Sequence, residues 1–378
     1  MKSIKKNDLI FVIFISIFSI ALFFLPTGFE NPSHTDSALR EKAKILKVDN
    51  SDLRSFSIVT TGTQDVEMVI LSGKFKGDTV KAKNVLMGQK RLDKIFKQGD
   101  KVLAVLQLDE TKEHYIGARA DDYYRLNLEL ILFLCFATYL VFFARWTGFK
   151  AILSFIFTAL SFWKILIPLY LKGYSPLFVA LFIVILTTTV ITILVSGINR
   201  KGLVALLGTV AGISITATLA LVFGYFFKIP GTVQEYSETL LYTGFMDLNL
   251  SEIFISVIFI SAAGAVMDVA MDISAAQNEI ILKIPEISKS ELIKSGFHIA
   301  QPVIGTMTTT LLFAYSGSFM FVFMVFMTKG TPMISIANTN YISAEILHTL
   351  VGSFGLVLVA PITAIIGGYV YSFRKKDV

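Results

Sequence analysis

The stretch EIFISVIFISAAGAVMDVAMDISA, residues 252–275, is long and apolar enough to cross a lipid bilayer, yet it contains two aspartates deep in its apolar part. About 20 apolar residues span the hydrocarbon core. Asp268 and Asp272 are four residues apart, so a helix places them on one face together with Gly264. A charge in hydrocarbon costs roughly 2.5–3.5 kcal/mol on insertion scales. The stretch therefore predicts a membrane helix with a site for a proton, an ion or a polar substrate.

Similar apolar runs recur along the whole chain. Its 378 residues are 54% hydrophobic and only 16% charged, whereas a soluble domain has about 25% charged residues. The further runs are Leu9–Leu25 and residues 127–145, 150–171, 175–197, 202–227, 300–327 and 345–373. The sequence thus predicts a polytopic α-helical membrane protein with about eight transmembrane helices. A signal peptide is the alternative for the first run, but that run is long and no small-x-small cleavage motif follows it.

Residues 27–125 have a different character and no run that could span a membrane. They hold 17 Lys/Arg and 15 Asp/Glu, and turn signals separate short β-like runs. These runs are Ala43–Val48, Val66–Leu71, Thr79–Val85 and Val102–Leu108. We expect a small β domain of barrel or OB-like type after the first helix. Its nearly balanced charge argues against nucleic acid and other polyanions, so we expect either an interaction domain that binds a protein partner or a spacer.

The distribution of basic residues predicts the orientation. Of the 17 Lys/Arg outside residues 27–125, 13 fall on the side of the N-terminus, three on the other side, and Lys164 within a span. The positive-inside rule then places both termini in the cytoplasm. The predicted order is a cytoplasmic N-terminus with the first helix (1–26), an extracytoplasmic β domain (27–125), a seven-helix membrane domain (126–373) and a cytoplasmic tail (374–378).

A threonine cluster is the expected neighbour of Asp268. Residues 274–296 read as a cytoplasmic loop, with a helix beginning at Ser288 through a capping box. The next span runs outward from it, and Thr308, Thr309 and Thr310 then lie at about the depth of Asp268. A carboxylate beside hydroxyls suits a proton relay. An aspartate hydrogen-bonded to threonines for helix packing is the alternative.

Other polar and small residues give weaker signals. Glu345 and His348 are three apart, but a metal site would need further ligands. Stripes of glycine near 208–212 and 352–368 predict close helix packing. No P-loop, G-x-S-x-G or H-E-x-x-H motif occurs. We therefore expect no metal, no cofactor and no soluble-type catalytic site. An intramembrane aspartyl protease would need carboxylates on two helices, whereas the two aspartates here share one helix. A lipid-processing enzyme is disfavoured as well, because the sequence contains no catalytic motif for it.

At these residues the chain resembles the YibE/F family of bacterial membrane proteins. The resemblance covers nearly the whole length and rests on the turn LSGKFKG (71–77), on QGDKV (98–102) and above all on the segment 264–272. It implies a multi-pass protein of the bacterial cell membrane and no particular activity. A shorter likeness, from Gly264 through Gly296 to Leu311, is to the SecD/SecF type of proton-driven RND transporter. There the residue matched by Asp268 belongs to the proton-coupling region.

Two functions follow as expectations. The first is a transporter or proton-coupled membrane protein in which Asp268, Asp272 and Thr308–Thr310 line the ion path. The second is a non-transporting envelope scaffold whose β domain binds a protein partner, although seven further spans exceed what an anchor needs.

Overall fold

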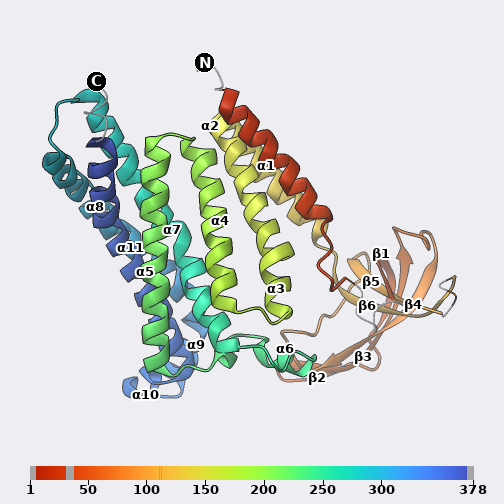
Figure 1. The fold of residues 1–378 in the computed structure, drawn as a ribbon. Helices are drawn as coiled ribbons and strands as arrows, with labels where there is room; N and C mark the ends of the chain where they lie inside the picture. The colour runs from red at the N-terminus through yellow and green to blue at the C-terminus, as the bar shows by residue number, and fades with distance from the viewer. Residues whose placement is uncertain (1–5, 31–37, 110, 112, 373–378) are drawn as a thin grey trace. The chain divides into compact units, whose positions relative to one another are not determined.

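A computed structural model describes residues 6–30, 38–109, 111 and 113–372 (Figure 1). The chain divides into two compact units. The helical unit comprises Met1–Thr27 and Val141–Val378, and the sheet unit comprises Gly28–Leu140.

The sheet unit contains a six-stranded antiparallel sheet that curls into a half-barrel. Its strands run in the order β2-β3-β1-β5-β6, and β4 pairs with β3. The strands are β1 (Ala38–Asp49), β2 (Arg54–Phe56), β3 (Val59–Ile70), β4 (Thr79–Met87), β5 (Lys101–Leu108) and β6 (Tyr115–Tyr123). The four predicted β runs are confirmed in β1, β3, β4 and β5, except that β3 ends at Ile70, one residue before the end of the predicted run. The sequence missed β6, whose nine residues YIGARADDY carry three charges and little apolar alternation.

A buried glutamine fixes the long connection between β4 and β5 to the sheet. Gln64 on β3 is completely buried. Its Nε2 donates to the Phe96 carbonyl at 2.9 Å, and its Oε1 accepts from the Phe96 amide at 3.1 Å. Phe96 is itself 1% exposed in the core of this unit. The side-chain amide thus takes the place of a strand partner, because it makes the hydrogen bonds that the buried backbone amide and carbonyl of Phe96 require.

Helices make up nearly all of the helical unit, and the first of its long helices, which starts at Leu126, begins within the residues of the sheet unit. The helices are α1 (Lys6–Phe24), α2 (Leu126–Ser161), α3 (Ile167–Leu171), α4 (Pro176–Ser196), α5 (Arg200–Phe227), α6 (Ser237–Tyr242), α7 (Leu250–Lys283), α8 (Lys289–Ser316), α9 (Met320–Thr328), α10 (Met333–Ala337) and α11 (Asn340–Ser372), with a π-helical turn, Phe162–Leu166, between α2 and α3. Non-helical backbone angles at Arg145 (φ 51°, ψ −124°) break α2 into two helices.

Five helices of the described chain are long and apolar enough to cross a membrane. They are the continuous stretch Leu126–Leu171, then α4, α5, α7 and α11; the pair α8 and α9, bent by 63°, would make a sixth. Asp8–Phe24 of α1 is apolar but shorter. The sequence predicted one span over 300–327, whereas the structure breaks it at Gly317–Phe319.

The predicted loop over 274–296 is wrong for most of its length. Helix α7 continues to Lys283, and α8 begins directly at Lys289. The capping box is confirmed: the Ser288 side chain accepts from the Glu291 amide, and the Glu291 carboxylate accepts from the Ser288 amide.

Helix α7 lies in the middle of the helical unit, where it contacts α4, α5, α8 and α11 (Figure 1). Small residues permit the close approach. A Cβ at Gly212 of α5 would lie 2.7 Å from a Val266 methyl of α7, and one at Gly355 of α11 would overlap the Thr216 hydroxyl. The close packing predicted for these glycines is therefore confirmed.

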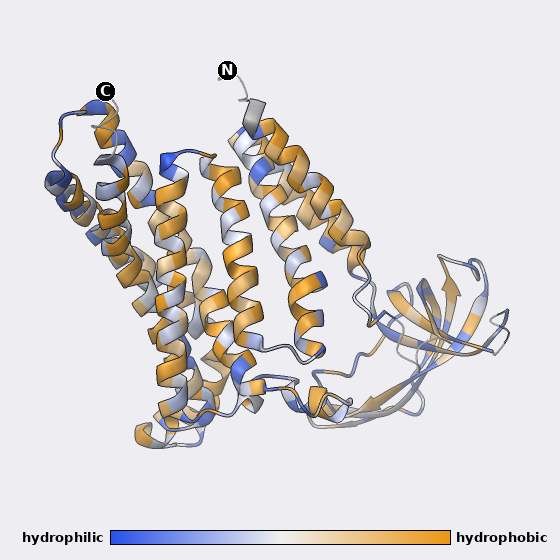
Figure 2. Cartoon of the chain, in the orientation of Figure 1, coloured by the Kyte–Doolittle hydropathy of each residue, from blue (hydrophilic) through white to orange (hydrophobic). Residues whose placement is uncertain are grey.

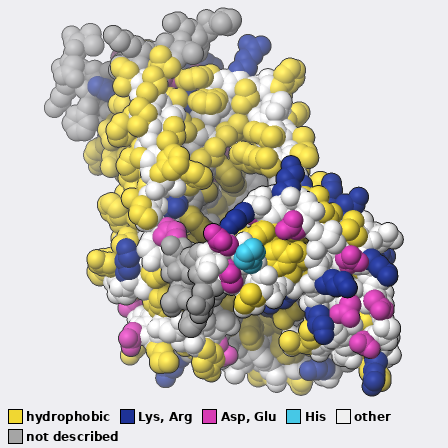
Figure 3. Space-filling model, turned by 90° about the vertical axis from the view of Figure 1, so that its right-hand side faces the viewer, with side chains coloured by type: hydrophobic (Ala, Val, Ile, Leu, Met, Phe, Trp, Pro, Cys, Tyr) yellow, Lys and Arg dark blue, Asp and Glu magenta, His cyan; other side chains and the backbone are white. Residues whose placement is uncertain are grey.

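The two units differ in surface character. Apolar residues cover the long helices of the helical unit, and polar residues gather at the helix ends (Figure 2). In the space-filling view, Lys, Arg, Asp and Glu side chains are scattered over the sheet unit, whereas the helical surface is mostly apolar (Figure 3). This contrast fits a membrane-embedded helical unit and a solvent-exposed sheet unit.

Candidate functional site

The two predicted carboxylates lie on an exposed face of α7. Ser261, Gly264, Asp268 and Asp272 are all exposed, while Val269 and the rest of the opposite face are buried against the neighbouring helices. We call these four residues the α7 polar face. Within the described residues, neither carboxylate takes part in a hydrogen bond or an ion pair. The face therefore presents two acids, without a partner among the described residues, in the apolar stretch of a helix long enough to span a membrane.

The threonines of α8 are half-buried or exposed, and each is bonded to its own helix. The hydroxyl of Thr308 donates to the Ile304 carbonyl at 2.8 Å, and the hydroxyls of Thr309 and Thr310 make the equivalent bonds at 3.2 and 3.0 Å. No hydrogen bond joins them to Asp268 among the residues that the structure describes. Their oxygens retain free lone pairs, so they can still accept from a protonated group or coordinate a cation.

A second polar cluster joins three helices. Ser261 of α7 and His348 of α11 are hydrogen-bonded, with 2.5 Å between Oγ and Nε2. The Tyr315 ring of α8 lies over the His348 ring, with centroids 4.3 Å apart and an angle of 30° between planes. Glu345 lies on the other side of His348, with 3.9 Å between Oε2 and Nδ1. We call Ser261, Tyr315, Glu345 and His348 the His348 cluster.

Sequence reasoning found only half of this cluster. The sequence indicates Glu345 and His348, because they are three residues apart on one predicted helix. Ser261 is 87 residues away from His348 along the chain, and a lone serine in an apolar run carries no signal of its own. Only the packing of α7, α8 and α11 brings the group together.

Ser261 belongs to both polar features. It is seven residues before Asp268, which is about 10 Å along a helix of 1.5 Å rise per residue, and on the same face. The His348 cluster therefore lies at one end of the α7 polar face, and Asp268 and Asp272 continue that face toward the other end of the helix.

Gln277 fixes the helix geometry beyond Asp272. It is completely buried, and its Nε2 donates to the carbonyls of Leu292 in α8 (3.2 Å) and Ala364 in α11 (3.0 Å). The same three helices that form the His348 cluster are thus tied together again about four turns away. Such double attachment holds the polar face of α7 at a defined rotation.

No metal centre emerges from these groups. Within the described ranges, no set of three His, Cys, Asp or Glu side chains is placed to hold a metal ion. The chemistry available to the described residues of the site is proton exchange by carboxylates and imidazole, and coordination by hydroxyl oxygens.

Comparison with protein families assigns the chain. Residues 132–373 match the profile of the YibE/F-like protein, and residues 38–123 match the YibE/F family N-terminal domain. Neither a curated protein nor a solved structure matches significantly. Together the two profiles cover the sheet unit's strands and nearly all of the long helices, so the chain belongs to the YibE/F family.

Proposed function

We propose that this protein is a multi-pass transporter or proton-coupled protein of the bacterial cell membrane, in which a proton or another small cation moves along the α7 polar face. One observation carries the proposal: Asp268 and Asp272 lie exposed and unpaired, within the described residues, on a helix of membrane-spanning length. Acids in such a position are costly unless they meet water, a mobile ion or a partner. Thr308–Thr310 of α8 would supply further oxygens.

The proposal includes eight membrane crossings. The stretch Leu126–Leu171 has 46 residues, about 69 Å of helix and more than twice the hydrocarbon thickness. Its break at Arg145 supports two crossings. With α1, α4, α5, α7, the bent pair α8–α9, and α11, the total is eight. Helix α1 begins at the end of the helical unit where α11 ends (Figure 1), as an even number requires. The basic residues favour cytoplasmic termini.

An OB-like fold is proposed for the sheet unit. Strand β1 pairs with both β3 and β5, β4 extends the sheet beyond β3, and β6 extends it beyond β5. Strands β4 and β6 also lie close to each other, which supports a partly open five-stranded barrel with a short added strand β2. The strand order and the closeness of β4 and β6 favour this partly open barrel over an open sheet.

A proton-flux measurement tests the role of Asp268. The full chain is reconstituted in vesicles containing a trapped pH-sensitive dye, and a potassium diffusion potential drives protons inward. We expect wild-type protein to acidify the lumen faster than protein-free vesicles do. Asp268→Asn should return the rate to that of empty vesicles without loss of membrane insertion, and Asp247→Asn, an exposed loop position, serves as control. Equal rates for wild type and Asp268→Asn would overturn the proposal.

The envelope scaffold remains a second candidate because the sheet unit contains a groove. Its volume is about 600 Å³, and its lining includes Lys47, Glu67 and Lys81, which are neighbours across three strands. Alternating charges of this kind suit a protein partner with matching polar groups. Deletion of residues 30–122 should abolish a scaffold function completely and leave a transport function partly intact.

A further inference from the structure

The His348 cluster contains a carboxyl group and an imidazole, and its hydrogen bonds allow two tautomers of the imidazole. The single hydroxyl hydrogen of Ser261 has two acceptors within reach, the Ile258 carbonyl at 2.9 Å and Nε2 of His348 at 2.5 Å. If the carbonyl accepts it, Nε2 of a neutral ring carries the ring hydrogen; if Nε2 accepts it, Nδ1 carries the ring hydrogen.

Neither neutral tautomer supplies a charge that balances an ionised Glu345. Nδ1 of His348 lies 3.9 Å from Oε2 of Glu345, and the two side chains are only 13% and 16% exposed. An ionised carboxylate beside a neutral ring is therefore an uncompensated charge in a site that water barely reaches, and such a charge is costly. One added proton removes it, either as an imidazolium–carboxylate pair or as a carboxylic acid beside a neutral imidazole.

We infer that Glu345 and His348 together hold one shared proton beyond the ring hydrogen of a neutral imidazole, and that this pair is a proton-binding site separate from Asp268 and Asp272. The inference does not rest on the proposed function, because the burial of the pair is the same whether or not protons cross the membrane.

Among the described residues, no hydrogen bond or ion pair joins Glu345 or His348 to a charged side chain other than each other. Helix α7 contributes the neutral Ser261, α8 contributes the Tyr315 ring, and α11 contributes Thr349, whose hydroxyl donates to Oε1 of Glu345 at 3.4 Å. The short 3-10 turn Gly231–Val233, which also packs on this part of α11, has no ionisable side chain. The added proton can therefore be bound by the imidazole or by the carboxyl group, and both groups belong to this pair.

Nitrogen NMR and infrared spectroscopy of the full chain in membranes test the inference directly. The chain has four histidines, so ¹⁵N-histidine labelling gives few signals, and His348→Gln identifies the one of interest. At pH 7 we expect one of two results. Either His348 carries hydrogen on both nitrogens, or it carries hydrogen on one nitrogen alone while a protonated carboxyl band appears that Glu345→Gln removes.

Variants refine the test. If His348 is the doubly protonated partner, Glu345→Gln should lower the ratio of protonated to neutral His348 at pH 7 by about tenfold, the factor for one unit of coupling. Ser261→Ala should let hydrogen redistribute between the two ring nitrogens, whereas His298→Gln, an exposed position on α8, should change neither signal. A wild-type His348 with hydrogen on only one nitrogen, together with an ionised Glu345, would overturn the inference. The deciding protonation states are those of the wild-type chain, and they are independent of the flux measurement on Asp268.

Discussion

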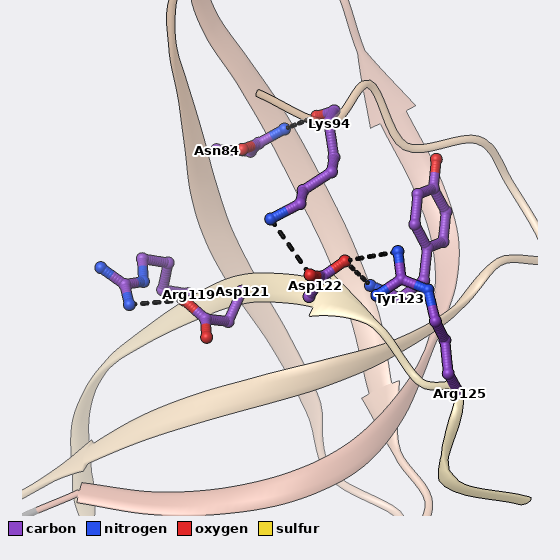
Figure 4. A network of polar contacts seen from close by, with 7 residues as sticks. All are labelled: Asn84, Lys94, Arg119, Asp121, Asp122, Tyr123 and Arg125. Carbon is purple, nitrogen blue, oxygen red and sulfur yellow. Dashed lines mark hydrogen bonds and ion pairs between the residues drawn. The ribbon is translucent and has the colours of Figure 1, made fainter. Parts of the chain in front are cut away.

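Asp122, at the end of β6, shows how one side chain organises several neighbours. Its carboxylate oxygens lie 3.1 Å from Nζ of Lys94 and 3.0 Å from Nη2 of Arg125, and the Tyr123 amide donates to it at 2.6 Å (Figure 4). Partial burial raises the pKa of the Asp122 carboxyl, but hydrogen bonds from Arg125, the Tyr123 amide and Lys94 outweigh it. The net pKa lies below its usual value of 3.8.

This lowered pKa predicts a pH-dependent contribution to stability. Because the folded pKa is below the unfolded one, the contribution is fully present above about pH 5 and is lost as the pH falls through the folded pKa. Asp122→Asn should destabilise the sheet unit by about 1 kcal/mol at pH 7, a charged hydrogen-bond value reduced for solvent screening. The difference from wild type should shrink as the pH falls below the unfolded pKa of about 3.9. Hydrogen exchange at β5 and β6 in the full chain measures it.

Asp121 provides the matched control for this prediction. It pairs with Arg119 at 2.6 Å, but the two side chains are 40% and 65% exposed (Figure 4). Exposed ion pairs contribute little, so Asp121→Asn should change protection by less than Asp122→Asn at every pH. An equal effect of both variants would contradict the role assigned to the Asp122 network.

At the scale of helices and strands, features set by local chemistry could be predicted and features set by tertiary partners could not. The capping box at Ser288 is a local pattern, and it is confirmed. The stretch after Asp272 looked like a loop because it contains Ser274, Gln277 and Asn278. In the structure, Ser274 and Gln277 are buried and bonded to neighbouring helices, so their polarity does not end α7.

The same difference between local patterns and tertiary contacts explains how much of the candidate site could be predicted from the sequence. Two acids four residues apart are visible in the sequence, and their common face on α7 follows from helix geometry alone. The His348 cluster depends on contacts between α7, α8 and α11, which no local pattern encodes. The break between α8 and α9 was likewise missed, since the apolar composition of 300–327 continues through it.

Helix α1 is attached to the helix that follows Arg145 at both of its ends. Near its start, Oδ2 of Asp8 lies 3.3 Å from Nζ of Lys150, a lysine whose side chain is only 7% exposed. Near its end, Nζ of Lys164 donates to the Leu25 carbonyl at 2.8 Å. These contacts favour an α1 that stays in the protein over a cleaved signal peptide.

Removal of one partner tests this attachment. Asp8→Asn leaves the Lys150 ammonium buried without its counter-ion, which should cost about 3 kcal/mol. Combining Asp8→Asn with Lys150→Met should recover most of the loss, because a buried charge is then replaced by an apolar side chain of similar length. Thermal unfolding of the full chain in detergent measures both, with Lys172→Met at an exposed position as control. Identical melting of Asp8→Asn and wild type would mean that α1 is not packed in this way.

At the scale of the whole molecule, the proposed topology makes the sides of three positions testable. The chain has one cysteine, Cys135, so Cys135→Ser provides a background without thiols. On it, Asp78→Cys marks the turn between β3 and β4, Pro285→Cys the connection between α7 and α8, and Lys329→Cys the end of α9. All three positions are exposed.

A membrane-impermeant maleimide applied to intact cells should label Asp78→Cys and Lys329→Cys, and it should label Pro285→Cys only after permeabilisation. The results at Asp78 and Pro285 follow from the excess of basic residues on the side of the termini. The result at Lys329 has a separate meaning. A crossing by the bent pair α8–α9 carries this residue to the outer side, whereas a re-entrant α8–α9 returns it to the inner side and removes one crossing. Labelling of Lys329→Cys only after permeabilisation, together with outside labelling of Asp78→Cys, would therefore replace eight crossings by seven and move the C-terminus to the outer side, because only α11 follows.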